Sequence, residues 1–173
     1  MKIVLTGEPG IGKTTVVKKV VDIIKDIAVG FWTEEVRDRK TKKRTGFKIV
    51  TTEGKEILFA SKTFTSKKIV GSYGVNVERF ESLAIPIIKR AMSCKNCIVV
   101  IDEVGKMELF SRKFRDILKE ILSDRKRKYL ITIPIRDVHR IVAQLRRDPD
   151  TILIEVSKEN RETLPEDIVE MLK

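Results

Sequence analysis

Long apolar runs are absent from this sequence of 173 residues. A helix that spans a membrane needs roughly 20 consecutive apolar residues, so no segment is expected to cross one. The first strand-like run, residues 2–6, begins too early to leave room for a secretory signal peptide. We therefore expect a cytoplasmic protein with no membrane partner. The length favours a single domain, residues 1–173, with a sizeable core.

Histidine and cysteine are scarce, which argues against a metal centre built from these residues. His139 is the only histidine, and Cys94 and Cys97 form one C-x-x-C pair. A structural zinc site needs four such ligands. The pair is therefore interpreted as two small residues that enter a strand, with a reversible disulfide as the open alternative. Amides are also rare, with one Gln and three Asn beside 35% charged residues, a composition typical of a thermophile's protein.

Aromatic residues make up only 6% of the chain, and none is interleaved with the basic runs. The net charge of +11 favours contact with phosphates, including those of nucleic acid. Single-stranded nucleic acid, however, is commonly held by aromatic platforms set among the cations. Here the basic runs are spread along the chain, at residues 37–44, 67–68, 125–128 and 146–147. Nucleic-acid binding is therefore an open alternative that the sequence does not favour.

What the sequence does contain is a complete phosphate-binding loop near its start. Residues 7–14 read GEPGIGKT and satisfy G-x-x-x-x-G-K-[ST] at each fixed position, between a β-rich run and a helical pattern. The glycines permit backbone angles that turn N–H groups toward phosphate oxygens, and the helix dipole adds to that field. Lys13 is predicted to bind the β and γ phosphates, Thr14 to ligate Mg²⁺ and Thr15 to reach the α phosphate. The predicted nucleotide-binding residues of this loop are Gly7, Glu8, Pro9, Gly10, Ile11, Gly12, Lys13, Thr14 and Thr15.

A second motif is the apolar run of residues 97–101 followed by Asp102 and Glu103. A buried strand that ends in two acids places both carboxylates at the carboxyl edge of a parallel sheet, where ligands bind in open α/β folds. Asp102 is predicted to act with Thr14 at Mg²⁺, and Glu103 to orient and polarise the attacking water. A water-activating Glu favours hydrolysis over transfer to an alcohol.

The hydrophobic pattern predicts strands that alternate with helices. The expected strands are 2–6, 27–33, 97–101, 129–133 and 151–156, and the expected helices are 13–25, 77–92, 111–123, 138–146 and 165–172. Residues 34–75 have period two and turn signals, which predicts a β-hairpin or small antiparallel insertion with strands at 45–51, 56–59 and 69–73. The expected fold class is α/β, a P-loop NTPase three-layer sandwich with a mostly parallel sheet and a five-stranded parallel core. By fold-level analogy, strand 129–133 is expected between strands 2–6 and 97–101.

Several separated segments share one family's pattern. They are residues 5–15, 30–37 (GFWTEEVR), 46–47, 80–86, 101–111 (IDEVGKMELFS), 132–134 and 160–161. Together they resemble the THEP-type nucleoside-triphosphatases, the family that includes the human cancer-related nucleoside-triphosphatase, over nearly the full length. The resemblance implies a Mg²⁺-dependent hydrolase of nucleoside triphosphates with broad base tolerance. Residues 135–140 (IRDVHR) depart from the shared pattern, which leaves the roles of Arg136, His139 and Arg140 open.

Three further residues complete the predicted site. Lys106 follows the acid pair closely and is predicted to act on the γ phosphate as an internal cation, so the catalytic set is Glu103, Lys13 and Lys106. Asn160 is expected to contact the base or ribose, and Gly105 also belongs to the predicted nucleotide-binding set. The expected reaction is hydrolysis of ATP, GTP, CTP, UTP and TTP to the diphosphate and phosphate by a protein favoured to be a monomer. A nucleoside, nucleotide or polynucleotide kinase and a nucleic-acid-dependent ATPase are the alternatives.

Overall fold

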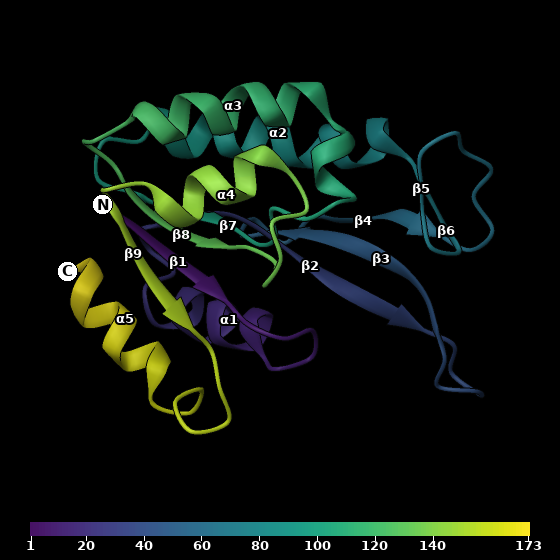
Figure 1. Ribbon diagram of the computed structural model, residues 1–173, viewed down its shortest axis with the longest axis horizontal. Helices are drawn as coiled ribbons and strands as arrows, with labels where there is room; N and C mark the ends of the chain where they lie inside the picture. Colours follow the sequence, from purple (N-terminus) through teal and green to yellow (C-terminus); the bar gives the residue numbers. More distant parts are fainter.

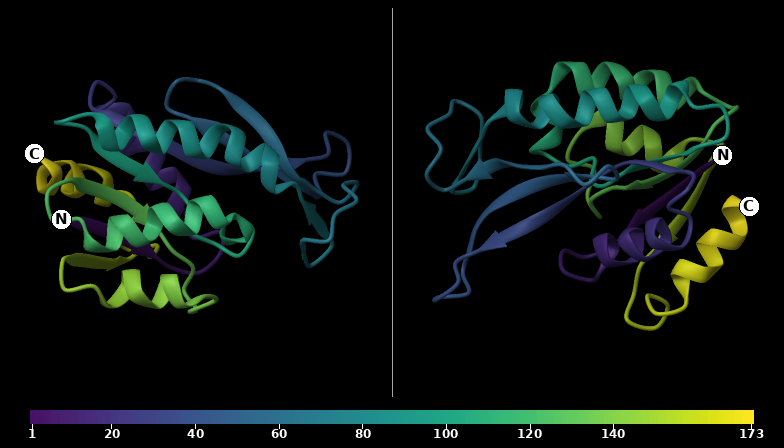
Figure 2. Two further views of the ribbon diagram at one scale, coloured as in Figure 1. Left: turned by 90° about the horizontal axis from the view of Figure 1, so that it is seen from above. Right: turned by 180° about the vertical axis from the view of Figure 1, so that it is seen from behind.

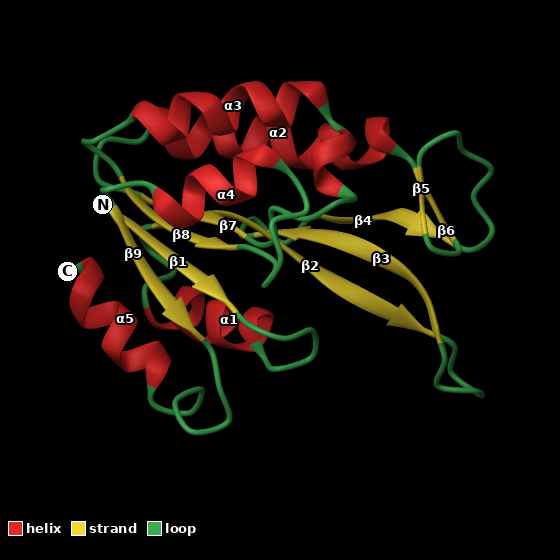
Figure 3. Cartoon of the chain, in the orientation of Figure 1, coloured by secondary structure: helices red, strands yellow, loops and turns green.

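A computed structural model describes residues 1–173 as one nine-stranded sheet with helices on both faces (Figure 1; Figure 3). The strands are β1 (Lys2–Thr6), β2 (Ala28–Arg37), β3 (Arg44–Thr51), β4 (Glu56–Ser61), β5 (Ile69–Val70), β6 (Tyr73–Val75), β7 (Ile98–Ile101), β8 (Lys128–Thr132) and β9 (Thr151–Glu155). The helices are α1 (Lys13–Ile23), α2 (Val77–Ser93), α3 (Arg112–Ser123), α4 (Arg140–Arg147) and α5 (Leu164–Leu172). None of the helices combines the length and apolarity needed to cross a membrane.

The strand order is β5-β6-β4-β3-β2-β7-β8-β1-β9. The last five strands of that order pair in parallel, and β8 lies between β7 and β1, as expected by analogy with other P-loop folds. Parallel neighbours end at the same edge of the sheet, so the loops that follow β1, β7 and β8 converge there. This edge carries the candidate site.

Alternate residues of the central strands face two separate cores. In β7, Val99 and Ile101 pack beneath α2, α3 and α4, whereas Ile98 and Val100 pack toward α1 and α5. The right panel of Figure 2 shows the resulting three layers from behind. Burial on both faces explains why the central strands read as continuous apolar runs. The expected α/β architecture with a mostly parallel sheet is therefore confirmed.

The antiparallel part of the sheet differs from the prediction in two places. The strand expected at 27–33 continues to Arg37, so the predicted insertion starts within β2, which pairs with β3 through Arg37 (Figure 1). The single strand expected at 69–73 is wrong, because residues 69–75 form the two short antiparallel strands β5 and β6. Gly71, with φ of 59°, makes the turn that reverses the chain between them. The pattern predicted extended structure here but missed the reversal.

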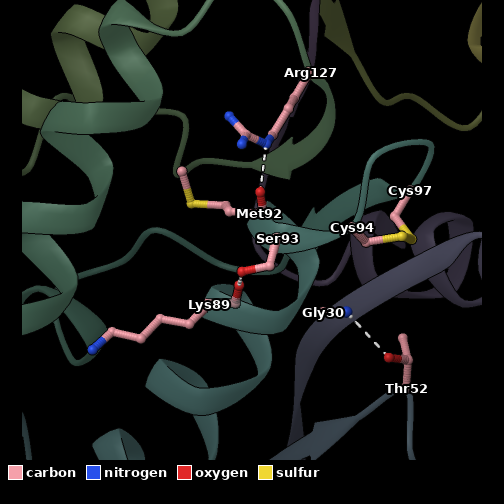
Figure 4. The surroundings of a disulfide bond; sticks show 8 residues. All are labelled: Gly30, Thr52, Lys89, Met92, Ser93, Cys94, Cys97 and Arg127. Atoms are coloured by element: carbon pink, nitrogen blue, oxygen red, sulfur yellow. Dashed lines mark hydrogen bonds between the residues drawn. A yellow bond between two sulfur atoms is a disulfide. The ribbon is translucent and has the colours of Figure 1, made fainter.

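Cys94 and Cys97 form a disulfide in the turn from α2 to β7, which corrects their interpretation as two separate small residues (Figure 4). The last turn of α2 is further fixed by Arg127, whose Nε donates to the carbonyl of Met92 at 2.8 Å. Because β7 begins after this turn and ends at the site, the disulfide lies at the opposite edge of the sheet. It is therefore a structural feature of the far end of the molecule.

Candidate functional site

The glycine loop, residues 7–14, connects β1 to α1 at the carboxyl edge of the sheet. Gly7, Gly10 and Gly12 all have positive φ, at 151°, 80° and 114°. Such angles are open to glycine and turn backbone N–H groups toward the inside of the loop. Gly12 is the N-cap of α1, and the positive end of that helix points to the same place. The loop is therefore shaped to hold an anion.

Two side chains from the start of α1 contact the centre of this loop and the end of β7. Lys13 Nζ donates to the carbonyl of Gly7 at 2.9 Å and lies 3.6 Å from Glu103 Oε2. Thr14 Oγ1 donates to Asp102 Oδ2 at 2.8 Å. Two residues of the loop thus face the two acids that follow β7. The Lys13 ammonium lies opposite Glu103, and the Thr14 hydroxyl lies opposite Asp102. The sequence predicted both members of each pair, and the structure brings them together.

Asp102 is buried, with 1% of its surface exposed, and both of its carboxylate oxygens accept hydrogen bonds. The second donor is the hydroxyl of Thr132, a fully buried residue at the end of β8. Burial raises the pKa of Asp102 to about 6, although the two hydroxyl hydrogen bonds act in the opposite direction. Thr132 therefore fixes the orientation of Asp102.

Thr14 and Asp102 offer a hydroxyl and a carboxylate at one place, the ligand chemistry that suits Mg²⁺. Mg²⁺ is commonly held by one or two protein oxygens while substrate phosphates and water complete its octahedron. The structure contains no cluster of three or more His, Cys, Asp or Glu residues that would hold a metal without such help. The residues present therefore fit a metal that arrives with a nucleotide.

A cleft of about 920 Å³ opens in front of the loop. One wall is the outer part of β2 with β3, and another is the loop between β8 and α4. Its lining residues are Gly7, Glu8, Pro9, Gly10, Gly12, Lys13, Thr14, Thr15, Lys18, Thr33, Glu34, Glu35, Arg37, Arg44, Phe47, Glu103, Pro134, Ile135, Arg136 and Val138. Most predicted loop residues are in this set. Ile11 instead packs against the α1 core, and Asp102 lies behind the cleft surface.

Three predicted residues lie elsewhere. Lys106 is exposed, has no hydrogen bond or ion pair, and does not line the cleft. Gly105 N donates to Glu108 Oε1 at 3.0 Å. Asn160 uses its amide within its own loop, because Oδ1 accepts from Ser157 N and Nδ2 donates to the carbonyl of Glu155, both at 2.8 Å. The nucleotide roles given to these residues stay predictions.

Other residues of the site lie outside the predicted nucleotide-binding set, although the sequence suggested Arg161 as a base or ribose contact and Arg136 as part of a lid in the kinase alternative. Arg161 Nη1 donates to the carbonyl of Ile11 at 3.0 Å and so braces the glycine loop from the chain after β9. Glu108 is buried, and its burial together with the charge of Glu103 raises its pKa to about 8. Arg37, Arg44 and Arg136 enter the cleft from its two walls. Their positions next to predicted strands were visible in the sequence, but nothing there showed which way these side chains point.

Fold and site together define an α/β protein whose anion-binding loop faces a pair of carboxylates, the arrangement of an enzyme that acts on nucleotides. The family described as NTPase matches residues 2–169, and the chain belongs to this family. The resemblance inferred from the motifs is thus confirmed.

Named relatives match over almost their whole length. The nucleoside-triphosphatase THEP1 of Aquifex aeolicus is 58% identical over 177 residues, covering 100% of this chain and 99% of the relative. The human cancer-related nucleoside-triphosphatase is 37% identical over 179 residues, covering 95% and 93%. The crystal structure of the Aquifex THEP1 superposes with a TM-score of 0.93 at 55% identity, covering 100% of this chain and 99% of that one. The solution structure of the human protein gives 0.83 at 35% identity, covering 99% and 97%.

Proposed function

We propose that this chain is a P-loop NTPase that hydrolyses nucleoside triphosphates to the diphosphate and phosphate. The observation that carries the proposal is that the glycine loop faces the two acids after β7. Lys13 lies 3.6 Å from Glu103, and Thr14 is hydrogen-bonded to Asp102. The activity in the names of its full-length relatives supports the same reaction.

The loop binds the phosphates in this proposal. Its inward N–H groups and the N-terminus of α1 hold the phosphate oxygens, and Lys13 turns from Glu103 and the Gly7 carbonyl toward the β and γ phosphates. Thr14 and Asp102 would hold Mg²⁺, which supplies neutralisation of the phosphate charge when bound. Thr132 keeps Asp102 in the orientation that this requires.

Glu103 is the proposed general base. Its carboxylate, 29% exposed, borders the cleft beside Lys13, where a water molecule has access. The water oxygen forms a bond to the γ phosphorus while the bond from that phosphorus to the β–γ bridging oxygen breaks. Glu103 accepts the proton of the water, and the bridging oxygen leaves with the diphosphate. Hydrolysis needs no acceptor other than this water.

Broad base tolerance follows from what the cleft offers. The glycine loop contacts phosphates only, and the amide of Asn160, the predicted base contact, is already engaged within its own loop. One or two hydrogen bonds provide modest discrimination between bases. We therefore expect kcat/KM for ATP and GTP to agree within about tenfold, the equivalent of roughly 1.4 kcal/mol.

Phosphate release from ATP, GTP, CTP, UTP and TTP, with Mg²⁺ or with a chelator, tests the proposal. The expected result is Mg²⁺-dependent release from all five without any added acceptor. A kinase would release little phosphate until a nucleoside or nucleotide acceptor is supplied. A nucleic-acid-dependent ATPase would require RNA or DNA, an effect that weakens at higher salt. Either of these outcomes would replace the hydrolase assignment.

A further inference from the structure

The loop between β8 and α4, residues 134–138, is fixed to the root of the glycine loop. Arg146 of α4 donates from Nη2 to the carbonyls of Pro134 and Ile135, at 2.7 and 3.1 Å. Thr6, the last residue of β1, donates from its hydroxyl to the same Pro134 carbonyl at 3.1 Å. Arg146 Nε also donates to Asp137 Oδ1 at 3.0 Å. These bonds hold the β8–α4 loop against the strand that leads into the glycine loop.

Arg136 stands in the middle of this fixed segment. Its own carbonyl accepts a hydrogen bond from Val138 N at 2.9 Å, which closes a tight turn centred on Asp137. Its side chain is exposed, lines the cleft, and has no hydrogen bond or ion pair. The backbone is therefore held in place while the guanidinium stays free to bind something that enters the cleft.

The cations of the cleft single out Arg136. Five line it, namely Lys13, Lys18, Arg37, Arg44 and Arg136. Lys18 lies 3.1 Å from Glu34, Arg37 and Arg44 lie 2.6 and 3.2 Å from Glu35, and Lys13 lies 3.6 Å from Glu103. Arg136 alone among the five has no carboxylate within 4.0 Å. It is thus the cation whose charge the protein leaves uncompensated.

We propose that Arg136 is a catalytic residue that binds the terminal phosphoryl oxygens of the bound triphosphate. This inference rests on the proposed function and gives Arg136 the role that the sequence suggested for Lys106, which lies outside the cleft. A guanidinium matches two phosphate oxygens with parallel N–H donors. As the bond between the γ phosphorus and the bridging oxygen breaks, Arg136 stabilises the charge on the transferred group from the β8–α4 loop.

The experiment compares the parent with Arg136→Ala and Arg136→Lys, with Arg140→Ala as the matched control. Arg140 is an exposed arginine four residues away that lines no part of this cleft and has no ion pair. Phosphate release from MgATP should show kcat lower by roughly 10²–10³-fold in Arg136→Ala, the effect of removing one oriented donor to the reacting group. Arg136→Lys should retain more of the parent kcat than Arg136→Ala but not all of it, and Arg140→Ala should have the parent kcat. Added guanidinium ion should raise the rate of Arg136→Ala alone.

Binding without turnover separates this inference from the proposed function. Arg136→Ala should bind a non-hydrolysable triphosphate analogue at least about tenfold more weakly than the parent, yet bind ADP equally well, because ADP lacks the terminal group. A parent that releases no phosphate would overturn the hydrolase assignment, and the analogue-to-ADP comparison would still decide the contact. Parent kcat in Arg136→Ala, or an equal loss of affinity for ADP and the analogue, would overturn the role of Arg136.

Discussion

Glu108 carries a buried carboxyl group whose ionisation should control part of the pH dependence of stability. The side chain is 6% exposed, and its Oε1 accepts a hydrogen bond from Gly105 N at 3.0 Å. Its pKa is raised from the ordinary 4.5 to about 8. Burial is the larger cause, and the negative charge of Glu103 is the next. At neutral pH Glu108 is therefore predominantly protonated in the native protein.

The direction of the effect follows from proton counting. Between pH 4.5 and about 8 the native state keeps a proton on Glu108 that the unfolded chain releases. The free energy of unfolding must therefore fall as pH rises through this window, by up to about 1.4 kcal/mol per pH unit from this group. The stabilisation is fully present below pH 4.5 and is lost once the pH passes about 8. Glu108→Gln keeps the size and the acceptor oxygen but cannot ionise, so the variant should lack this contribution.

Denaturant unfolding of the parent and Glu108→Gln from pH 5 to pH 9 measures this difference. Other groups titrate in both proteins, so their contributions cancel in the difference. The free energy of unfolding of the variant relative to that of the parent should therefore increase steadily as the pH rises to about 8. Glu120→Gln, a substitution at an exposed glutamate of α3 without an ion pair, is the control and should follow the parent. Parallel curves for the parent and Glu108→Gln would refute the assignment of a protonated Glu108.

The remaining predictions concern the cleft. Glu103→Gln should lower turnover by roughly 10²–10⁴-fold while triphosphate binding survives, as measured by single-turnover phosphate release and calorimetry, and parent turnover would remove Glu103 from the role of base. Lys13→Ala should abolish hydrolysis with an unchanged circular dichroism spectrum; near-normal turnover would contradict the phosphate-binding assignment of the loop. ATP and GTP should be hydrolysed with kcat/KM values within about tenfold, and a preference of several thousandfold would defeat the broad-specificity proposal.

The sequence predicted the central sheet well because burial there is the same on both faces. Strands such as β7 read as unbroken apolar runs, and the short length and β-branched residues of such a run favour a buried strand over a helix. The outer part of β2 is different, since Thr33–Arg37 is mostly polar and lines the cleft. This segment is a strand because it pairs with β3, which follows later in the chain, so the local pattern placed the end of β2 too early.

The candidate site shows the corresponding limit for side chains. The motif predicts that Lys13, Thr14, Asp102 and Glu103 converge, because the loop and the end of β7 meet at one edge. Residue type alone did not show that the side-chain amide of Asn160 forms its hydrogen bonds within its own loop. The sequence shows which hydrogen-bonding and charged groups a side chain carries. Which of those groups remain unpaired, and so can bind a ligand, depends on contacts that only the fold reveals.

Arg136 illustrates the same limit from the opposite side. In the sequence it is one of many arginines in a chain of net charge +11, and its neighbours depart from the family pattern. Its distinction arises from four segments that are far apart in the chain. Thr6 and Arg146 fix the loop that carries it, and carboxylates of β2 and of the residues after β7 neutralise the other cations of the cleft. Removing Thr6 or Arg146 would change the position of the Arg136 loop. Removing one of the carboxylates would leave a second cation of the cleft unpaired, so that Arg136 would no longer be the one unpaired cation. The case for Arg136 therefore rests on what surrounds it.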